Sequence, residues 1–255
     1  MTENKKFAPS NIFEGMTSIS AIINAKNGRN IERIWIDSVK QKSKASEISF
    51  LCAKSKELGY KIEFVESKEL DDITVGTTHG GIIAFCTERS IPSLTPDVIK
   101  KDGFYVFLEG IEDPYNFGYT VRSLYAAGVD GIVLPPRNWM NAAGVVARAS
   151  AGTSELIPMY VSASEDVADA FHRAGYQILC AGIRDSVSVF EETFRYPILL
   201  VIGGEKRGIS RNILNSADKI VRIDYGREFR GSLCASAAAA VLAFALLDQN
   251  KNRDE

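Results

Sequence analysis

Three short segments of the sequence hold residues whose types and spacing could do chemistry. The first, from Glu109 to Arg122, reads E-G-I-E-D-P-Y-N-F-G-Y-T-V-R. Its Asp-Pro pair predicts a turn, Asn116 is suited to the N-cap of a helix, and Arg122 follows on that helix among apolar residues. Because a desolvated guanidinium needs a partner, Arg122 is a candidate for binding a phosphate or a carboxylate. Helix capping alone would account for Asn116.

The second segment, Gly203–Ser210, reads G-G-E-K-R-G-I-S and directly follows a predicted strand. Paired glycines allow a backbone to approach a ligand closely, which would place Glu205 at the mouth of a site. The segment matches neither of the common glycine-rich nucleotide-binding motifs. A simple strand-to-helix turn explains its spacing equally well.

The third segment, Gly231–Ala240, reads G-S-L-C-A-S-A-A-A-A. Ser232 can cap a helix whose first turns consist of small residues. Small residues permit close packing, either between two helices or between a ligand and the backbone. Packing between helices is the simpler interpretation, so no segment identifies a function by itself.

The elements that must position these segments divide near residues 91–96, I-P-S-L-T-P, where two prolines indicate an extended connection. We therefore predict two domains, residues 1–93 and residues 94–255. In the first, the pattern predicts a small α/β domain, with helices at 16–23 and 46–58 and strands at 31–36, 62–65 and 82–86.

In the second domain, short apolar strands are predicted at 104–108, 131–134, 177–181, 198–202 and 219–223. Helices are predicted between and after them, at 117–127, 142–151, 165–174, 210–215 and 233–248. This alternation indicates a parallel sheet covered on both faces, and ligands of such sheets bind beyond the carboxyl ends of the strands. The loops after Leu108, Ile202 and Ile223 hold the three segments.

In this order, the three segments resemble the motifs of the SpoU (TrmH-type) family of RNA ribose 2′-O-methyltransferases, within the SPOUT superfamily. The first resembles the motif D-P-x-N-x-G…R, and the third resembles S-L-N-x-S-x-A. The second, together with V-R-I at 221–223, resembles G-[SA]-E-x-x-G-[LM]-S…[VI]-x-I-P. Residues 148–152, R-A-S-A-G, match a further recurrent segment of the family. Residues 12–86, with T-H-G-G-I near their end, resemble the ribosomal-protein-like substrate-binding domain often fused in front.

The resemblance implies an α/β fold: a trefoil-knotted SPOUT methyltransferase domain with a parallel sheet, preceded by the small α/β RNA-binding domain. It implies a homodimer that uses S-adenosylmethionine to methylate a ribose 2′-hydroxyl of structured RNA, with ribosomal RNA favoured over transfer RNA. The catalytic residues carried over from the motifs are Arg122, Asn116 and Glu205. The cofactor-binding residues carried over are Gly203, Ile223, Leu233 and Ser232. The resemblance leaves open whether Arg122 accepts the proton or only orients the substrate.

The sequence departs from the family motifs at three places. Cys234 stands where the third motif has Asn, Lys206-Arg207 make the second loop basic, and residues 225–230 replace a linker of small residues. Because Cys234 breaks the third motif, a catalytically silent RNA-binding homologue is an alternative. A nucleotide-dependent enzyme of Rossmann type is another, and a fold without a knot would favour it.

Composition adds limits rather than a function. The formal net charge is −2, so charge alone does not indicate RNA, although residues 1–44 hold eight Lys or Arg against four acidic residues. With two His and four widely spaced Cys, the sequence predicts no metal site and buried, reduced thiols. It contains no apolar run long enough for a membrane span and no secretory signal pattern, which favours a cytoplasmic protein.

Overall fold

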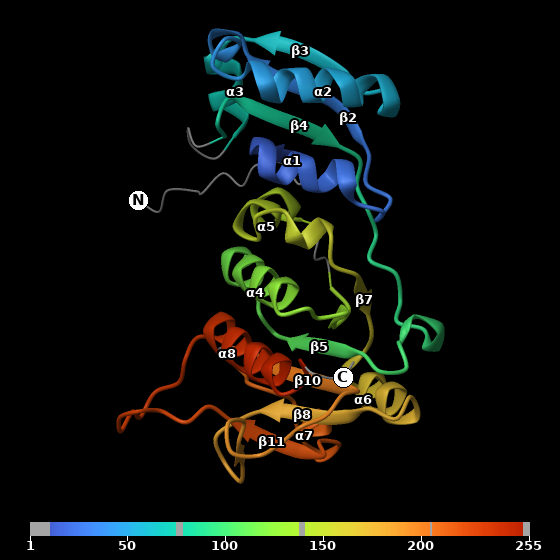
Figure 1. Cartoon of the computed structure of the whole chain (residues 1–255), viewed down its shortest axis with the longest axis vertical. Helices are drawn as coiled ribbons and strands as arrows, with labels where there is room; N and C mark the ends of the chain where they lie inside the picture. The colour runs from blue at the N-terminus through green and yellow to red at the C-terminus, as the bar shows by residue number, and fades with distance from the viewer. Residues whose placement is uncertain (1–10, 75–78, 138–140, 205, 252–255) are drawn as a thin grey trace. The chain divides into compact units, whose positions relative to one another are not determined.

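The computed structural model describes residues 11–74, 79–137, 141–204 and 206–251 of the 255-residue chain. The chain groups into two compact units (Figure 1). Unit 1 comprises Met1–Ser90 together with Asn138–Leu156, and unit 2 comprises Ile91–Arg137 together with Ile157–Glu255. Each unit has its own sheet and its own hydrophobic core.

Unit 1 is built on a four-stranded sheet in the order β1-β4-β2-β3. The strands are β1 (Ile12–Glu14), β2 (Ile31–Asp37), β3 (Lys61–Val65) and β4 (Ile82–Cys86). Of the strand pairs, β2 and β3 are parallel, whereas β4 is antiparallel to both of its neighbours. The helices within the first ninety residues are α1 (Gly15–Asn24), α2 (Ala45–Leu58) and α3 (Ser67–Ile73).

Alternating side chains of β2 divide the helices between the two faces of this sheet. Ile34 and Ile36 lie in a buried cluster with residues of α1 and α2. Trp35, which points the other way, packs in a second cluster with Leu70 of α3. The predicted small α/β domain is therefore confirmed as a fold.

A helix from the middle of the chain completes unit 1. α5 (Ala143–Ala149) contributes Ala143 and Ala147 to the cluster that holds α1 and β2. A Cβ atom on Gly144 would lie 2.0 Å from the carbonyl oxygen of Ile12, so the backbones of α5 and β1 can approach this closely only with glycine.

Buried charges join the residues after α5 to the first ninety residues. Glu155 accepts a hydrogen bond from Arg29 Nε at 3.0 Å, and both side chains are almost fully buried. Asn27 also donates to the Glu155 carboxylate, at 2.8 Å, and Arg89 Nε lies 3.8 Å from it. Burial lowers the pKa of the Arg89 guanidinium. Residues 141–156 thus share both the core and the charges of unit 1.

Unit 2 contains a seven-stranded parallel sheet in the order β7-β6-β5-β10-β8-β11-β9. Its strands are β5 (Phe104–Glu109), β6 (Gly131–Leu134), β7 (Met159–Val161), β8 (Gln177–Ala181), β9 (Val187–Ser188), β10 (Ile198–Gly203) and β11 (Lys219–Arg222). Its α-helices are α4 (Pro114–Ala126), α6 (Ser164–Arg173), α7 (Arg211–Asn215) and α8 (Ala235–Asp248). The predicted parallel sheet is confirmed.

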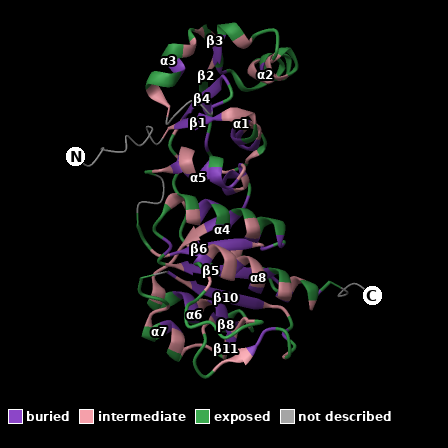
Figure 2. Cartoon of the chain, turned by 90° about the vertical axis from the view of Figure 1, so that its left-hand side faces the viewer, coloured by how far each residue is buried: buried purple, intermediate pink, exposed green. Residues whose placement is uncertain are grey.

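Helices cover both faces of this sheet. Phe171 of α6 and Ile213 of α7 share one buried cluster with strand residues such as Val201. On the other face, α8 contacts β10 and packs against α4. Figure 2 shows the central strands of unit 2 as a buried layer between partly exposed helices. Among the described residues, no helix has the length and apolar character needed to cross a membrane.

The sequence analysis expected buried thiols, but only two of the four cysteines are buried. Cys86 and Cys180 are buried, and burial raises the pKa of each thiol to about 12. Cys52 and Cys234 are exposed, because each lies on a helix or at a helix end that faces solvent. In the described part of the chain, no group of His, Cys, Asp and Glu is arranged to hold a metal ion.

Candidate active site

Two of the predicted loops touch at the carboxyl edge of the parallel sheet of unit 2. A Cβ atom on Gly204, which follows β10, would lie 2.1 Å from the carbonyl oxygen of Gly110, which follows β5. A Cβ atom on Gly203 would lie 2.4 Å from the carbonyl carbon of Gly208. Both glycines are therefore required by contacts between backbones, and this requirement holds whether or not a ligand is bound.

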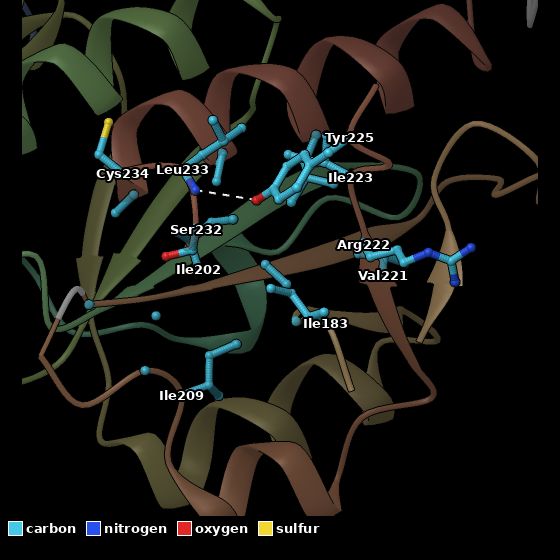
Figure 3. A pocket seen from close by; sticks show the side chains of 18 residues that line it. Ile183, Ile202, Ile209, Val221, Arg222, Ile223, Tyr225, Ser232, Leu233 and Cys234 are labelled. Carbon is cyan, nitrogen blue, oxygen red and sulfur yellow. Dashed lines mark hydrogen bonds between the residues drawn. The ribbon is translucent and has the colours of Figure 1, made fainter. Parts of the chain in front are cut away.

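A cavity of about 610 Å³ opens beside these loops. The predicted cofactor residues Gly203, Ile223, Ser232 and Leu233 all line it (Figure 3). Its wall is formed by the ends of β8, β10 and β11 and by the start of α8. A cavity of this size, at the carboxyl ends of parallel strands, suits a small-molecule ligand.

The lining consists mostly of apolar residues and glycines, with Arg222, Tyr225 and Ser232 among its polar members. Ile183, Ile202 and Ile209 contribute aliphatic side chains (Figure 3). The backbone N–H of Leu233 donates to the hydroxyl of Tyr225 at 3.3 Å. Residues 181–183, at the carboxyl end of β8, belong to the lining but were not predicted. The reason is topological: β8 lies between β10 and β11 in space, and their order in the sequence does not show this.

The first segment lies beside the cavity and lines a separate, smaller one. Asn116 shares a hollow of about 110 Å³ with Glu112 and Lys206, whose charged groups lie 3.4 Å apart. Asn116 is not the N-cap that the sequence analysis expected. Asp113 is the N-cap, and its carboxylate accepts from the backbone N–H of Asn116 at 2.9 Å. Pro114 takes the first helical position, where its lack of an N–H costs nothing, and this sets the start of α4.

Arg122 differs from expectation in its surroundings. It is exposed on α4, and it forms no ion pair with any residue in the described ranges. Neither Arg122 nor Asn116 lines the larger cavity. Glu205, the third predicted catalytic residue, lies outside the described residues. A single chain therefore brings the predicted cofactor residues together but does not bring Arg122 to them.

The start of α8 also differs from expectation. The N-cap is Cys234, with an extended backbone (φ −61°, ψ 155°), and Ser232 lies two residues before it in the lining of the cavity. The Cys234 sulfur lies 3.3 Å from the Ser236 hydroxyl. The helix begins two residues later than predicted, because residues 232 and 233 lie outside it and line the cavity wall (Figure 3).

Neither histidine is among the residues that line the cavity. His79 is buried in unit 1, where its Nε2 lies 3.0 Å from Asp71 Oδ1 and its Nδ1 accepts from the backbone N–H of Gly81. His172, on α6, lies 3.2 Å from Asp218.

The sequence model described as the SpoU rRNA Methylase family matches residues 103–244, more than half of the chain. The chain belongs to the SpoU rRNA Methylase family. A second model, described as RNA 2′-O ribose methyltransferase substrate binding, matches residues 12–92. The first match spans all three predicted motifs, and the second covers most of unit 1.

Relatives of this SpoU family chain match it over most of their length. The 23S rRNA (guanosine-2′-O-)-methyltransferase RlmB of Shewanella oneidensis is 25% identical over 246 residues, covering 94% of this chain and 98% of that protein. The mitochondrial rRNA methyltransferase 1 of Schizosaccharomyces pombe is 27% identical over 232 residues, covering 75% and 76%. The AdoMet-bound rRNA methyltransferase from Sinorhizobium meliloti superposes with a TM-score of 0.76, at 23% identity, over 92% of this chain and 85% of that one. This last likeness shows the shared fold.

Membership of the SpoU family confirms three predictions from the sequence. The chain is an RNA methyltransferase, its cofactor is S-adenosylmethionine, and its fold is that of SPOUT methyltransferases preceded by a substrate-binding domain. Family membership also argues against a nucleotide-dependent enzyme of Rossmann type, the second alternative of the sequence analysis.

Proposed function

We propose that this chain transfers the methyl group of S-adenosylmethionine to a ribose 2′-hydroxyl of ribosomal RNA in the cytoplasm. One observation carries the proposal: Gly203, Ile223, Ser232 and Leu233, assigned to the cofactor from sequence motifs alone, line a single cavity in the structure. RlmB of Shewanella oneidensis is a 23S rRNA methyltransferase and the Schizosaccharomyces pombe relative is an rRNA methyltransferase, which supports ribosomal RNA as the substrate.

The cavity fits S-adenosylmethionine in size and in chemistry. Its volume of about 610 Å³ lies within the range usual for cofactor sites. Apolar side chains suit the faces of an adenine ring, and the backbone of Gly203, Ile223 and Leu233 can supply hydrogen bonds. When bound, the cofactor supplies an electrophilic methyl group carried on a sulfonium. The residues around it hold and orient that group, because methyl transfer needs the acceptor oxygen in line with it.

The chain must also prepare the acceptor, since a ribose hydroxyl is a weak nucleophile until its proton is removed. We assign Arg122 to orienting an RNA phosphate and to stabilising the negative charge that develops on the 2′ oxygen. Asn116 and Glu205 are proposed to act with it. The small hollow that joins Asn116 to the loop after β10 supports a shared role for the first two motifs.

We further propose that the active site forms in a homodimer. Tyr115, Tyr119 and Arg122 recur at helical spacing along α4, and both tyrosines are about half exposed. On α8, which packs against α4, Phe244 is exposed to a similar extent. A second copy covering these apolar side chains would place the partner's Arg122 where a single chain lacks it. We also propose that the chain of unit 2 forms the trefoil knot that the family resemblance implies.

The domains are proposed to divide the work. Residues 1–93 would bind RNA and residues 94–255 would carry the catalytic site. The match of residues 12–92 to a substrate-binding domain supports this division.

Methyl transfer to purified RNA tests the proposed function. The chain is incubated with labelled S-adenosylmethionine and either ribosomal or transfer RNA, and the RNA is then hydrolysed in alkali. A 2′-O-methyl group protects the adjacent phosphodiester, because the 2′ oxygen is the nucleophile in alkaline cleavage. Label in alkali-stable dinucleotides from ribosomal RNA is expected. Label in single nucleotides would indicate base methylation, and RNA binding without any label would indicate the catalytically silent homologue.

A further inference from the structure

Two cations stand side by side on one face of the sheet of unit 1. Arg33 of β2 is in register with Lys61 of β3 on one side and with Phe85 of β4 on the other. Residues in register on neighbouring strands point to the same face of a sheet. Like charges directly opposite each other are destabilising, so this pair needs an explanation beyond the stability of the fold.

No carboxylate in the described part of the chain lies within ion-pair distance of these two cations. Arg33 and Lys61 are both exposed, and neither forms an ion pair with a described residue. The next pair along the strands is Trp35 and Glu63, but the Glu63 carboxylate accepts a hydrogen bond from the indole N–H at 2.6 Å. The two cations outnumber this carboxylate, so this end of the face carries a net positive charge and forms a positive patch.

Aromatic rings hold the guanidinium of this patch in place. The Arg33 guanidinium lies over the ring of Phe85, 4.1 Å from its centroid, and 5.2 Å from that of Trp35. The two rings meet edge to face at 4.9 Å. Because its bond to Glu63 fixes the indole, the group of Arg33, Trp35 and Phe85 is ordered before any ligand arrives.

The helices leave this end of the face accessible. α1, α2 and α5 pack on the opposite face of the sheet. On the face of Arg33, the described residues include one helix, the short α3, whose Leu70 and Ile73 pack near Trp35. Arg33 and Lys61 remain exposed beyond it.

We propose that Arg33, Trp35 and Lys61 form a binding site for an unpaired nucleotide of the substrate RNA. The base stacks on the Arg33 guanidinium beside Trp35, and Lys61 pairs with a neighbouring phosphate. Unpaired bases commonly stack on aromatic rings and on guanidinium planes, whereas bases within a duplex are not available for this contact. The inference rests on the proposed function in one respect, namely that RNA is the substrate.

Two double variants of the full-length chain test the site. Arg33→Gln with Lys61→Gln removes both charges of the patch. Lys42→Gln with Lys56→Gln removes two exposed charges near or on α2, which covers the opposite face. Affinity is measured without cofactor, as a function of salt, for a single-stranded RNA oligonucleotide of mixed sequence and for its duplex. The melting temperature of each variant is recorded alongside.

The patch variant should bind single-stranded RNA about tenfold more weakly, and the slope of log affinity against log salt should fall by about 0.7, because Lys61 alone pairs with a phosphate. The control variant should change the affinity less than twofold. Arg33→Lys keeps the charge but loses the planar group, so it should weaken single-strand binding and leave duplex binding unchanged. The melting temperature of the patch variant should change little, since the relief of a repulsive pair offsets the loss of the Arg33 contact with Phe85 and Trp35.

Equal losses in the patch and control variants, or unchanged affinity of a folded patch variant, would overturn the site. If the double variant does not fold, Arg33→Lys and Lys61→Gln singly provide the same comparison. Because binding is measured without cofactor, the site and the proposed function fail separately. A chain that binds RNA through this patch but transfers no methyl group would contradict only the proposed function.

Discussion

Arg122 should matter for methyl transfer but not for the stability of the fold. Its exposure means that Arg122→Ala should leave the fold intact, with a change in the free energy of unfolding within about 0.5 kcal/mol. Methyl transfer should nevertheless fall by at least a hundredfold if this group stabilises charge on the 2′ oxygen, because such contacts contribute about 2.7–4 kcal/mol. Turnover, cofactor affinity and melting temperature should be measured together. Retention of about a tenth of wild-type turnover, equivalent to about 1.4 kcal/mol, would remove Arg122 from the catalytic residues.

The position of Cys234 at the start of α8 predicts that the asparagine of the family motif can replace it. Because Cys234 is the N-cap of α8 and is exposed, the asparagine found in the family motif can be accommodated there as a helix cap. An asparagine side chain accepts from backbone N–H groups of the first turn, which typically adds about 0.5–2 kcal/mol over a residue that cannot cap. We expect Cys234→Asn to raise the melting temperature and to preserve methyl transfer, with Cys234→Ala as the control that removes the thiol without adding a cap. A lower melting temperature for the asparagine variant would show that the pocket is built around the thiol.

At the scale of elements, the sequence predicts the parts that bury continuous apolar runs. The long strands of unit 2 and helices such as α8 were identified within a few residues, because their side chains must face a core. The short strands β1, β7 and β9 and the helix α3 were missed, since so few residues carry little periodicity. The predicted cofactor residues did meet in one cavity, but the contribution of residues 181–183 depends on strand order. The position of Asp113 as N-cap could have been recognised from Pro114.

The packing of α5 and its following turn against unit 1 leads to a prediction about buried charge. Arg29→Met would leave the Glu155 carboxylate without its closest cation in a fully buried setting, which should cost about 3–5 kcal/mol. Combining it with Glu155→Met removes both partners of this ion pair and should recover part of that loss. The recovery is incomplete because buried Arg89, 3.8 Å from Glu155, then loses its carboxylate. Denaturant unfolding of the two single variants and the double variant gives the coupling between them. Independent, additive effects would show that Arg29 acts through its contacts with Phe13 and Thr87 instead.

At the scale of the whole molecule, a net charge of −2 means that RNA is not attracted by the overall field of the chain. Capture must therefore rely on local cations, such as Arg33 and Lys61 in unit 1 and the exposed Lys206 and Arg207 beside the cavity of unit 2. The cavity and Arg122 both belong to unit 2, but Arg122 does not line the cavity. A second copy of the chain is the simplest way to unite them.

Mixing two inactive variants tests this arrangement directly. Arg122→Ala removes the proposed catalytic group, and Ala238→Phe fills the cofactor cavity that Ala238 lines. If Arg122 acts in the partner's site, a mixed dimer contains one cavity that is open and faces an intact Arg122. Because random exchange in a two-fold dimer makes half of the dimers mixed, with one working site each, about a quarter of wild-type activity should return. Each variant alone should stay inactive and should elute as a dimer in size-exclusion chromatography. If Arg122 serves the cavity of its own chain, or if the chain is a monomer, no activity returns on mixing, because every cavity then lacks either its cofactor or its arginine.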